Sequence, residues 1–455
     1  MLVVLCATCL FMGGVSPQTQ ADEVKLLASD GVANDYFGHS VSLSSDKVVI
    51  GAYGDDSAGG ERSGSAYVYQ FDGTSWEETR LVASDREAED YFGFSVSVDG
   101  QLIAVGATLD NDQGEFAGSV YVYQHDGSNW IETKILASDG EAYDNFGWDV
   151  VLQEQTLVVG ARWDNDNGTS SGSVYVYQFD GVEWIETKLL ASDGATFDEF
   201  GSSVAIWEDL LVVGAPGDSD YGSASGSAYL FRFTGTNWIE VAKFHASDAA
   251  SSDEFGSSVS ISEGVIVVGS YDDNNENGID AGSAYVFRNQ GLAWIEEAKL
   301  IASEGSEDDY FGNTVSVDHD TIVVGTRYDD QNGYNAGCAY VYRYDGEHWS
   351  ETKLVASDGD EYDQFGFSTA LKNNTLVVGS YWDDESGSAS GSAYVLDIGL
   401  NACPDPSGDG VVDVNDILIV VDRWGQNDPV ADLNDDGVVS VLDLLLLIDN
   451  WGPCE

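Results

Sequence analysis

The sequence predicts an all-β fold: a seven-bladed β-propeller closed by its N-terminal strand, followed by a small α-helical module. The first observation is a repeat, in which Phe-Gly pairs recur 54 to 56 residues apart. The second is composition, because 52 Gly and only 6 Pro indicate many tight turns between short strands. Four β-patterned runs in a unit make one blade, and seven such units close a ring. The pairs begin at Phe37, Phe92, Phe146, Phe200, Phe255, Phe311 and Phe365.

The fourth repeat shows the pattern of one unit. Its four runs are FGSSVAI from Phe200, LLVVGA from Leu210, GSAYLFRF from Gly226 and WIEVAKF from Trp238. Asp-Gly pairs separate the third and fourth runs in several repeats and predict two-residue hairpin turns there. We expect these turns at Asp72-Gly73, Asp126-Gly127, Asp180-Gly181 and Asp345-Gly346.

The two ends of the repeat region predict how the ring closes. The seventh unit stops near Leu400 without a fourth run, whereas residues 24–30 (VKLLASD) match the fourth-run ending TKLLASD at residues 187–193. We therefore expect the N-terminal strand to complete the last blade, which leaves no open sheet edge. The propeller then spans residues 22–400. An open solenoid is the alternative.

These repeats resemble the FG-GAP repeats of integrin alpha chains and their bacterial relatives. The fullest match is Phe200-Gly201 with Gly214-Ala215-Pro216, and the resemblance covers residues 24–400. It implies a propeller that serves as a binding platform. Integrin-type repeats that bind calcium carry a D-x-D-x-D-G loop between the FG and GAP strands, but this chain has a short turn there, such as Glu208-Asp209. The resemblance therefore brings no calcium site to that connection.

The N-terminus indicates export. Residues 2–15 are almost wholly apolar and lead to Thr19-Gln20-Ala21, which predicts a signal peptide over residues 1–21. A membrane anchor is the alternative for this segment, and no later stretch is apolar enough to span a membrane. Cys6 and Cys9 leave with the signal, and Cys403 and Cys454 bracket the C-terminal module. We expect these last two to form a disulfide, with Cys338 unpaired, in a secreted or cell-surface protein.

Charge excludes one class of partner. The chain has 17 Lys and Arg against 80 Asp and Glu, for a net charge of −63. Such a surface repels nucleic acid and anionic lipid, so nucleic-acid binding is set aside. With 43% hydrophobic residues the chain is nevertheless expected to fold.

Most of the acidic charge is expected on one face of the ring. Loops between second and third strands emerge on the same face as loops between blades, and together they carry 42 of the 80 acidic residues. We count four Arg there (Arg62, Arg86, Arg162 and Arg327), so the face needs counter-ions. Three second-to-third loops read D-x-D-x-G and resemble half a calcium loop. Their carboxylates are Asp110 and Asp112, Asp164 and Asp166, and Asp218 and Asp220; simple Asx turns are the alternative.

Aromatic residues follow the second strands, close to this acidic face. They are Tyr53, Trp163, Tyr271, Tyr328 and Trp382. Exposed rings at these positions would stack on sugar faces of a glycan. Alternatively, they cover the tops of the blades.

The C-terminal segment, residues 401–455, contains two twelve-residue loops 27 residues apart. Alternate residues supply oxygen ligands around one cation, position 6 is Gly, and position 7 contributes its carbonyl. The first loop uses Asp405, Ser407, Asp409, Val411, Asp413 and Asp416, and the second uses Asp432, Asn434, Asp436, Val438, Ser440 and Asp443. We expect two Ca²⁺ ions here, and calcium-dependent folding.

Each loop leads into an apolar helix, DILIVVDRWG or DLLLLIDNWG. This arrangement resembles a type I dockerin, which implies attachment to a cohesin-like protein. The positions that often read Ser-Thr in cellulosomal dockerins are Val414-Asn415 and Val441-Leu442 here, which puts that partner in doubt.

No catalytic motif stands out. His39, His125 and His245 lie in three different units, and His319 and His348 lie far apart in the sixth, with no zinc-type spacing among the five. Gly168-Thr-Ser-Ser-Gly172 matches G-x-S-x-G but has no following helix. We expect a secreted, non-catalytic adhesion or interaction protein whose acidic face takes a glycan or protein ligand. A polysaccharide-degrading enzyme or its carbohydrate-binding accessory is the alternative.

Overall fold

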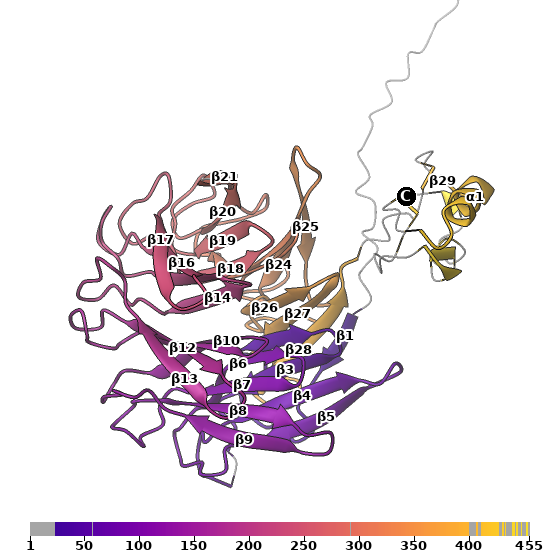
Figure 1. The fold of residues 1–455 in the computed structure, drawn as a ribbon. Helices are drawn as coiled ribbons and strands as arrows, with labels where there is room; N and C mark the ends of the chain where they lie inside the picture. The colour runs from indigo at the N-terminus through magenta and orange to yellow at the C-terminus, as the bar shows by residue number, and fades with distance from the viewer. Residues whose placement is uncertain are drawn as a thin grey trace, which may run out of the picture. The chain divides into compact units, whose positions relative to one another are not determined.

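A computed structural model describes residues 23–56, 58–291 and 293–399, and, further on, residues 406–407, 411–426, 430–431, 433, 439–441, 443–444, 447 and 452–453. Val24–Gly399 forms one compact unit, and residues 400–455 belong to a second. The first unit consists of seven four-stranded sheets around a central channel (Figure 1). The predicted all-β fold with seven blades is confirmed.

In each blade the first strand lines the channel and the fourth lies outermost. Blades 1 to 3 contain β2 (Val41–Ser44), β3 (Lys47–Ala52), β4 (Ser65–Phe71), β5 (Trp76–Leu81), β6 (Phe92–Asp99), β7 (Leu102–Ala107), β8 (Ser119–His125), β9 (Trp130–Ile135), β10 (Phe146–Gln153), β11 (Thr156–Ala161), β12 (Ser173–Phe179) and β13 (Trp184–Leu189). Blades 4 to 6 contain β14 (Ser203–Trp207), β15 (Leu210–Ala215), β16 (Ser227–Phe233), β17 (Trp238–Phe244), β18 (Ser258–Ser262), β19 (Val265–Ser270), β20 (Ser283–Asn289), β21 (Trp294–Leu300), β22 (Phe311–Asp318), β23 (Thr321–Thr326), β24 (Cys338–Tyr344) and β25 (Trp349–Leu354).

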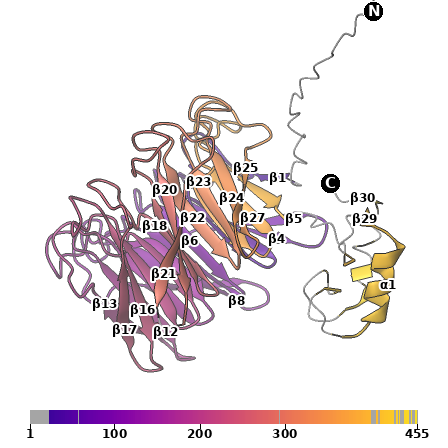
Figure 2. The same cartoon turned by 90° about the horizontal axis from the view of Figure 1, so that it is seen from above.

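The ring closes through the N-terminal strand, as predicted. Blade 7 contains β26 (Ser368–Lys372), β27 (Thr375–Ser380) and β28 (Ser392–Asp397), and its outermost strand is β1 (Glu23–Leu26). Figures 1 and 2 show β1 beside the strands of this last blade. Lys25 bonds Asp358 and Asp383 at 2.8 Å each, which fixes the strand to the far end of the repeat region. Because the ring is closed, the alternative of an open solenoid is wrong.

The glycines of the repeat lie where adjacent blades touch. Gly93, which follows Phe92, has φ +93°, and a Cβ there would overlap the backbone carbonyl of Ser65 in blade 1. A Cβ on Gly51, near the end of β3, would in turn overlap the carbonyl of Gly93. The same pair of glycines recurs at every blade boundary, including Gly379 against Gly38 where the ring closes. Only glycine permits so close a backbone approach.

The phenylalanines of the repeat form the core between sheets. Phe200 is fully buried, and its ring meets that of Tyr229 edge to face at 5.4 Å. Equivalent pairs occur in the other blades, such as Phe92 with Tyr121 at 5.4 Å. Truncating a buried Phe to Ala costs about 3–5 kcal/mol, so seven such residues carry much of the stability.

Serine side chains satisfy the free inner edges of several sheets. The Val98 N–H donates to Ser42 Oγ of the preceding blade at 3.0 Å, and the Val317 N–H donates to Ser260 Oγ at 3.0 Å. An unpaired strand edge would otherwise leave N–H groups without partners. These bonds therefore tie successive blades together along the channel.

The hairpin turns differ slightly from the prediction. The Asp72 N–H donates to the Ser75 carbonyl at 3.0 Å, so the two central residues are Gly73 and Thr74 and not Asp-Gly. Asp72 precedes the turn, and its Oδ1 accepts the N–H groups of residues 74 and 75 at 2.7 and 2.8 Å. The carboxylate organises the turn, and Gly73 supplies its φ of +96°.

The described residues of the second unit share a small core. β29 (Val411–Val412) pairs with β30 (Gly452–Pro453), and α1 (Val414–Asp422) begins within the last three positions of the first predicted loop. Asp413 caps α1 by accepting the Asn415 N–H at 2.6 Å. At and beyond the end of the second loop, Val441, Asp443, Leu444 and Leu447 are helical. The core contains Val412, Val420, Ala431, Val439 and Leu447.

Three further expectations concern export and cysteines. Cys338 is free and buried, as predicted. Residues 1–21, Cys403 and Cys454 lie outside the described residues, so the signal peptide and the disulfide stay predictions. In the part of the chain that the structure describes, no helix has the length and apolar character needed to cross a membrane.

We predict that ring closure depends on β1. Leu26 is 5% exposed and packs in the core between blades 7 and 1, so Leu26→Ala should lower the free energy of unfolding by about 2–4 kcal/mol. Val24 on the same strand is 44% exposed, and Val24→Ala is the matched control, expected within about 0.5 kcal/mol of the parent. Urea denaturation followed by tryptophan fluorescence measures both. Equal effects of the two substitutions would contradict the role of β1.

Candidate binding site at one end of the central channel

The acidic loops lie side by side, as predicted. The Glu89 N–H in the loop before blade 2 donates to the Glu61 carbonyl in a second-to-third loop at 2.8 Å. The Tyr143 N–H makes the same bond to the Glu115 carbonyl at 2.7 Å. The two sets of loops therefore form one continuous face.

Fourth-strand cations neutralise part of this face, which the sequence count missed. Lys188 Nζ lies 2.9, 2.8 and 2.7 Å from carboxylate oxygens of Asp139, Asp164 and Asp166. Burial alone would lower the pKa of Lys188, but these carboxylates raise it above its ordinary value. Each blade has one such cation, and the set is Lys25, Arg80, Lys134, Lys188, Lys243, Lys299 and Lys353. The sequence could have revealed these cations, because a Lys or Arg stands four residues before each Ser-Asp or Ser-Glu motif.

The candidate calcium half-loops contain these lysines. Asp110 and Asp112 bond Lys134 at 2.8 and 2.6 Å, and Asp218 and Asp220 bond Lys243 at 2.8 and 2.7 Å. The Asx-turn alternative is also present, since the Asp112 N–H donates to Asp110 Oδ1 at 2.9 Å. Equivalent bonds occur at Asp164 with Asp166 and at Asp218 with Asp220. Among the described residues, no group of His, Cys, Asp or Glu side chains is arranged to hold a metal ion.

A second set of carboxylates on this face is buried and holds its protons more tightly than usual. Asp144 is 3% exposed and accepts the Glu141 N–H at 2.7 Å. Burial, with a contribution from nearby Asp164, raises the pKa of Asp144 to about 6 despite that hydrogen bond. The same pKa of about 6 holds for Asp35, Asp90, Asp198, Asp309 and Asp363.

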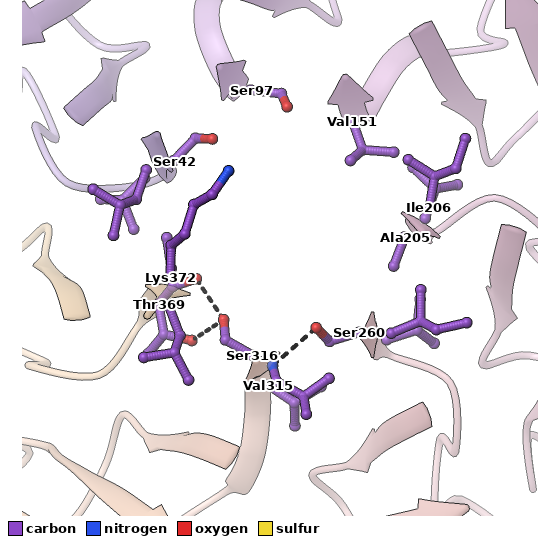
Figure 3. Close-up of a pocket in the computed structure, with 18 of the residues that line it drawn as sticks. Ser42, Ser97, Val151, Ala205, Ile206, Ser260, Val315, Ser316, Thr369 and Lys372 are labelled. Carbon is purple, nitrogen blue, oxygen red and sulfur yellow. Dashed lines mark hydrogen bonds between the residues drawn. The ribbon is translucent and has the colours of Figure 1, made fainter. Parts of the chain in front are cut away.

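The central channel encloses about 560 Å³ and is lined by the first strand of every blade. Figure 3 shows hydroxyl groups of Ser42, Ser97 and Ser260 around it, with Val151 and Ala205 between Ser97 and Ser260. Lys372 extends into the channel toward Ser97 (Figure 3). The wall is therefore part polar and part apolar.

Aromatic side chains gather at the end of the channel where the Phe-Gly turns lie. His39 lines the channel, and its ring lies 4.7 Å from Phe94 and 5.1 Å from Phe367. Burial lowers the pKa of His39 to about 4, so its imidazole is neutral at pH 7. We call this cluster the collar; its rings are Tyr36, His39, Tyr53, Tyr91, Phe94, Trp148, Trp163, Tyr271, Tyr310, Tyr328, Phe367, Tyr381 and Trp382.

The aromatic positions predicted from sequence all belong to the collar. Tyr53, Trp163, Tyr271, Tyr328 and Trp382 each contact another collar ring. Trp382 is 41% exposed, so it does not serve only as a cover for its blade. The sequence reading missed the residues on either side of the Phe-Gly pairs. These positions could have been found from the sequence, because several repeats have an aromatic residue directly before or after the Phe-Gly pair, such as Tyr36 and Phe94.

Two arginines are held in the collar by aromatic rings. Arg162 lies 3.4 Å from the Trp148 ring centroid and 4.7 Å from that of Trp163. Its Nη1 is 3.8 Å from Glu199, and burial lowers its pKa below the ordinary value. Arg327 lies within 6 Å of four rings, those of Tyr271, Tyr310, Tyr328 and Phe367. Aromatic stacking of this kind stabilises a guanidinium group in a partly buried place.

Unpaired polar groups lie beside these arginines. Among the described residues, the Nε of Arg327 is buried without a hydrogen-bond partner. Asp272 Oδ1 is likewise buried without a partner, and burial with the nearby Glu254 raises the pKa of Asp272 to about 7. Tyr271 donates its hydroxyl to Glu254. The collar therefore combines ring faces, donors and acceptors, an arrangement suited to binding.

The repeat itself now identifies the family. A family model described as FG-GAP repeat matches residues 21–69, 76–123, 130–177, 184–231, 238–287, 294–342 and 349–396, well over half of the chain. The chain belongs to the FG-GAP repeat family. No curated protein matches its sequence significantly. Each FG-GAP match begins near a fourth strand and ends in the third strand of the next blade, so it spans one blade boundary.

The predicted C-terminal ligands are only partly described. Asp405, Asp409, Asp432, Asn434, Asp436 and Val438 lie outside the described residues. In the first loop, Asp416 is fully buried and accepts the Ser407 and Asp413 N–H groups at 2.9 and 2.8 Å. In the second, Asp443 is fully buried and accepts those of Leu433 and Ser440 at 2.6 Å each. Val411 lies in β29.

The FG-GAP propeller does not assemble the hydrolase-like motif found in the sequence. Residues 168–172 lie in the loop between β11 and β12 with no helix after them, as expected. His125 and His319 lie in different blades, and neither His125 nor His245 faces the channel. The candidate binding site among the described residues of this FG-GAP chain is the collar.

We predict that Lys188 takes the place of a metal ion among its carboxylates. Lys188→Met should cost about 1–2 kcal/mol, less than the 3–5 kcal/mol of a fully buried pair, because Asp139 and Asp166 are half exposed. Calcium should restore part of that loss, since three carboxylates without the ammonium suit a divalent ion. Denaturation midpoints with and without calcium measure this. Lys372→Met is the control, and an equal calcium response in both variants would contradict the prediction.

We predict that acidification stabilises the propeller. The buried aspartates have folded-state pKa values of about 6, above 3.8 for the free group, so the folded state binds more protons between these values. The free energy of unfolding should therefore fall as pH rises from about 4 to 6. Burial raises the pKa of Asp139, but Lys188 lowers it, and the pKa lies below its ordinary value. At pH values below that window, Asp139 and the equivalent aspartates become protonated and lose their ion pairs.

Urea denaturation at pH 5 and pH 7.5 tests this pH dependence. Asp144→Asn removes one titrating group and should reduce the difference between the two pH values. A propeller more stable at pH 7.5 than at pH 5 would disprove the prediction.

Proposed function

We propose that this FG-GAP chain is an exported, non-catalytic binding platform that a calcium-dependent C-terminal module attaches to a partner protein. The observation that carries the platform role is the collar. Thirteen rings and two arginines from several blades converge at one end of the channel, on the acidic face. A rigid ring that gathers such side chains is suited to holding a ligand.

Calcium binding by the C-terminal module is supported by its two matching loops. In each, the carboxylate at position 12 is fully buried and accepts the N–H of position 9. A buried carboxylate with further carboxylates at alternate positions is the donor set that Ca²⁺ prefers. The residues present therefore fit the ion. Bound Ca²⁺ would supply the positive charge that draws the carboxylates of each loop together.

Attachment to a partner is supported by the outer face of α1. Val414, Leu418 and Val421 are 56%, 59% and 50% exposed and lie at i, i+4 and i+7, so they form one apolar stripe. Trp424, just beyond the helix, is 49% exposed. An exposed apolar stripe on a calcium-ordered helix suits a protein partner, cohesin-like in its role.

A polysaccharide-degrading enzyme or a carbohydrate-binding accessory is the second candidate. Asp272 favours it, because its raised pKa near Glu254 places a carboxylic acid beside a second carboxyl group at the collar. Release of reducing ends from a polysaccharide, abolished by Asp272→Asn, would select the enzyme. We place the enzyme second because Glu254 is already engaged, accepting the hydroxyl of Tyr271.

We predict that calcium orders the module and enables capture of its partner. Calcium at about 100 times its Kd should stabilise the module by about 2.7 kcal/mol, which is about 10 °C or more in Tm for so small a unit. Asp416→Asn and Asp443→Asn should remove most of this effect. Asp422→Asn, on the exposed end of α1, is the matched control. Calorimetry of the full chain measures these shifts.

The same variants test attachment. The full chain, used as bait against the surface and secreted fractions of its source cells, should retain one protein in calcium and release it in chelator. Leu418→Asp should abolish this capture and keep the calcium shift in Tm. If calcium neither stabilises the chain nor changes what it captures, the proposed role of the module is wrong.

A further inference from the structure

The ring faces of the collar are not needed to build a blade. Blade 4 has Ser202 after its Phe-Gly pair and Pro216 after its second strand, where blade 7 has Phe367 and Tyr381. Blade 4 nevertheless forms the same four-stranded sheet with the same buried core. The rings elsewhere are therefore additions to the fold, and Trp382 presents one to solvent.

The polar groups of the collar match a ligand that both donates and accepts hydrogen bonds. Arg327 is held by rings, and its Nε has no hydrogen-bond partner among the described residues; Asp272 Oδ1 has none there either. Arg162 is held in the same way by Trp148 and Trp163. A sugar ring fits this combination. Its C–H face stacks on an aromatic side chain, and its adjacent hydroxyl groups accept from and donate to the polar groups beside that side chain.

Charge decides between ligands of this kind. The net charge of −63 repels an anionic polymer, and Glu199 and Glu254 stand at the collar itself. A cationic ligand would be repelled by the guanidinium groups of Arg162 and Arg327, which already occupy the ring faces that could bind a cation. A ligand without net charge avoids both penalties.

We propose that the collar binds a neutral polysaccharide chain or its end, with sugar rings on Trp382 and the neighbouring tyrosines and hydroxyls bonded by Arg327 and Asp272. This inference rests on the proposed binding role of the propeller and names its ligand class. It needs no catalytic step. The half-apolar channel below the collar, about 560 Å³ in volume, offers room for a terminal residue of the chain.

Titration of the full chain with defined oligosaccharides tests the proposal. The neutral probes are hexamers of β-1,4-linked glucose, xylose and mannose; the charged probes are hexamers of galacturonate and of glucosamine. We expect at least one neutral hexamer to bind, with quenching of tryptophan fluorescence, and to bind more tightly than either charged one. Calorimetry gives the Kd for each.

Collar variants assign the binding to this site. Trp382→Ala should weaken it about tenfold and Trp382→Phe should restore most of it, because a ring face is what the sugar contacts. Arg327→Gln should weaken it about tenfold or more, since a charged donor is lost. Tyr221→Ala is the matched control: Tyr221 is an exposed ring that stacks on His245, outside the collar. Unchanged circular dichroism confirms that each variant folds.

Three results would overturn the proposal. They are no binding of any neutral hexamer, tighter binding of a charged hexamer, and binding that the collar variants leave unchanged. If no sugar binds but the full chain captures a protein that the Trp382→Ala and Arg327→Gln variants fail to capture, the ligand class proposed here is wrong and the platform role stands. If the collar variants change neither sugar binding nor protein capture, the platform role itself is wrong.

Discussion

The fold depends on backbone contact between adjacent blades. At every boundary a glycine after the repeat phenylalanine meets a glycine at the end of the preceding blade's second strand, with no room for a side chain. This contact sets the distance between sheets, and the buried phenylalanines and serine bonds then fit that distance. The two glycines that define the repeat are therefore a packing requirement and say nothing about a ligand.

On the acidic face, ion pairs with the fourth-strand cations reduce the repulsion among the many carboxylates. The fourth-strand lysines and Arg80 bond carboxylates from two neighbouring blades, as Lys188 bonds Asp139 and Asp164. Buried aspartates such as Asp144 favour their protonated form more than free aspartate does. The paired carboxylates therefore repel one another less than the sequence count suggests, whereas the ionised form of the buried aspartates costs stability at neutral pH. The face keeps its excess negative charge at the exposed loops, where solvent and salt screen it.

The sequence predicted the repeat, the seven blades and the closing strand because each rests on a local pattern repeated seven times. It missed the partners of the acidic residues, since Lys188 and Asp139 are 49 residues apart and meet only when blades pack. It placed Asp72 within a turn that Asp72 in fact precedes, because the side-chain bond that fixes the turn cannot be read from an Asp-Gly pair. Of the collar it found the residues after second strands and missed those beside the Phe-Gly pairs.

The seven repeats also act as an internal comparison, because all of them satisfy one set of packing constraints. The buried phenylalanines and boundary glycines are the same in every blade, and the aspartates equivalent to Asp144 recur likewise. The position after the Phe-Gly pair varies freely: it is His39, Phe94 and Trp148 in the first three blades and Ser202 in the fourth. A position that the fold leaves free, yet that gathers rings at one end of the channel, is where selection for binding is expected to act. We therefore expect the collar to determine what this propeller binds, whereas the shared core determines its shape.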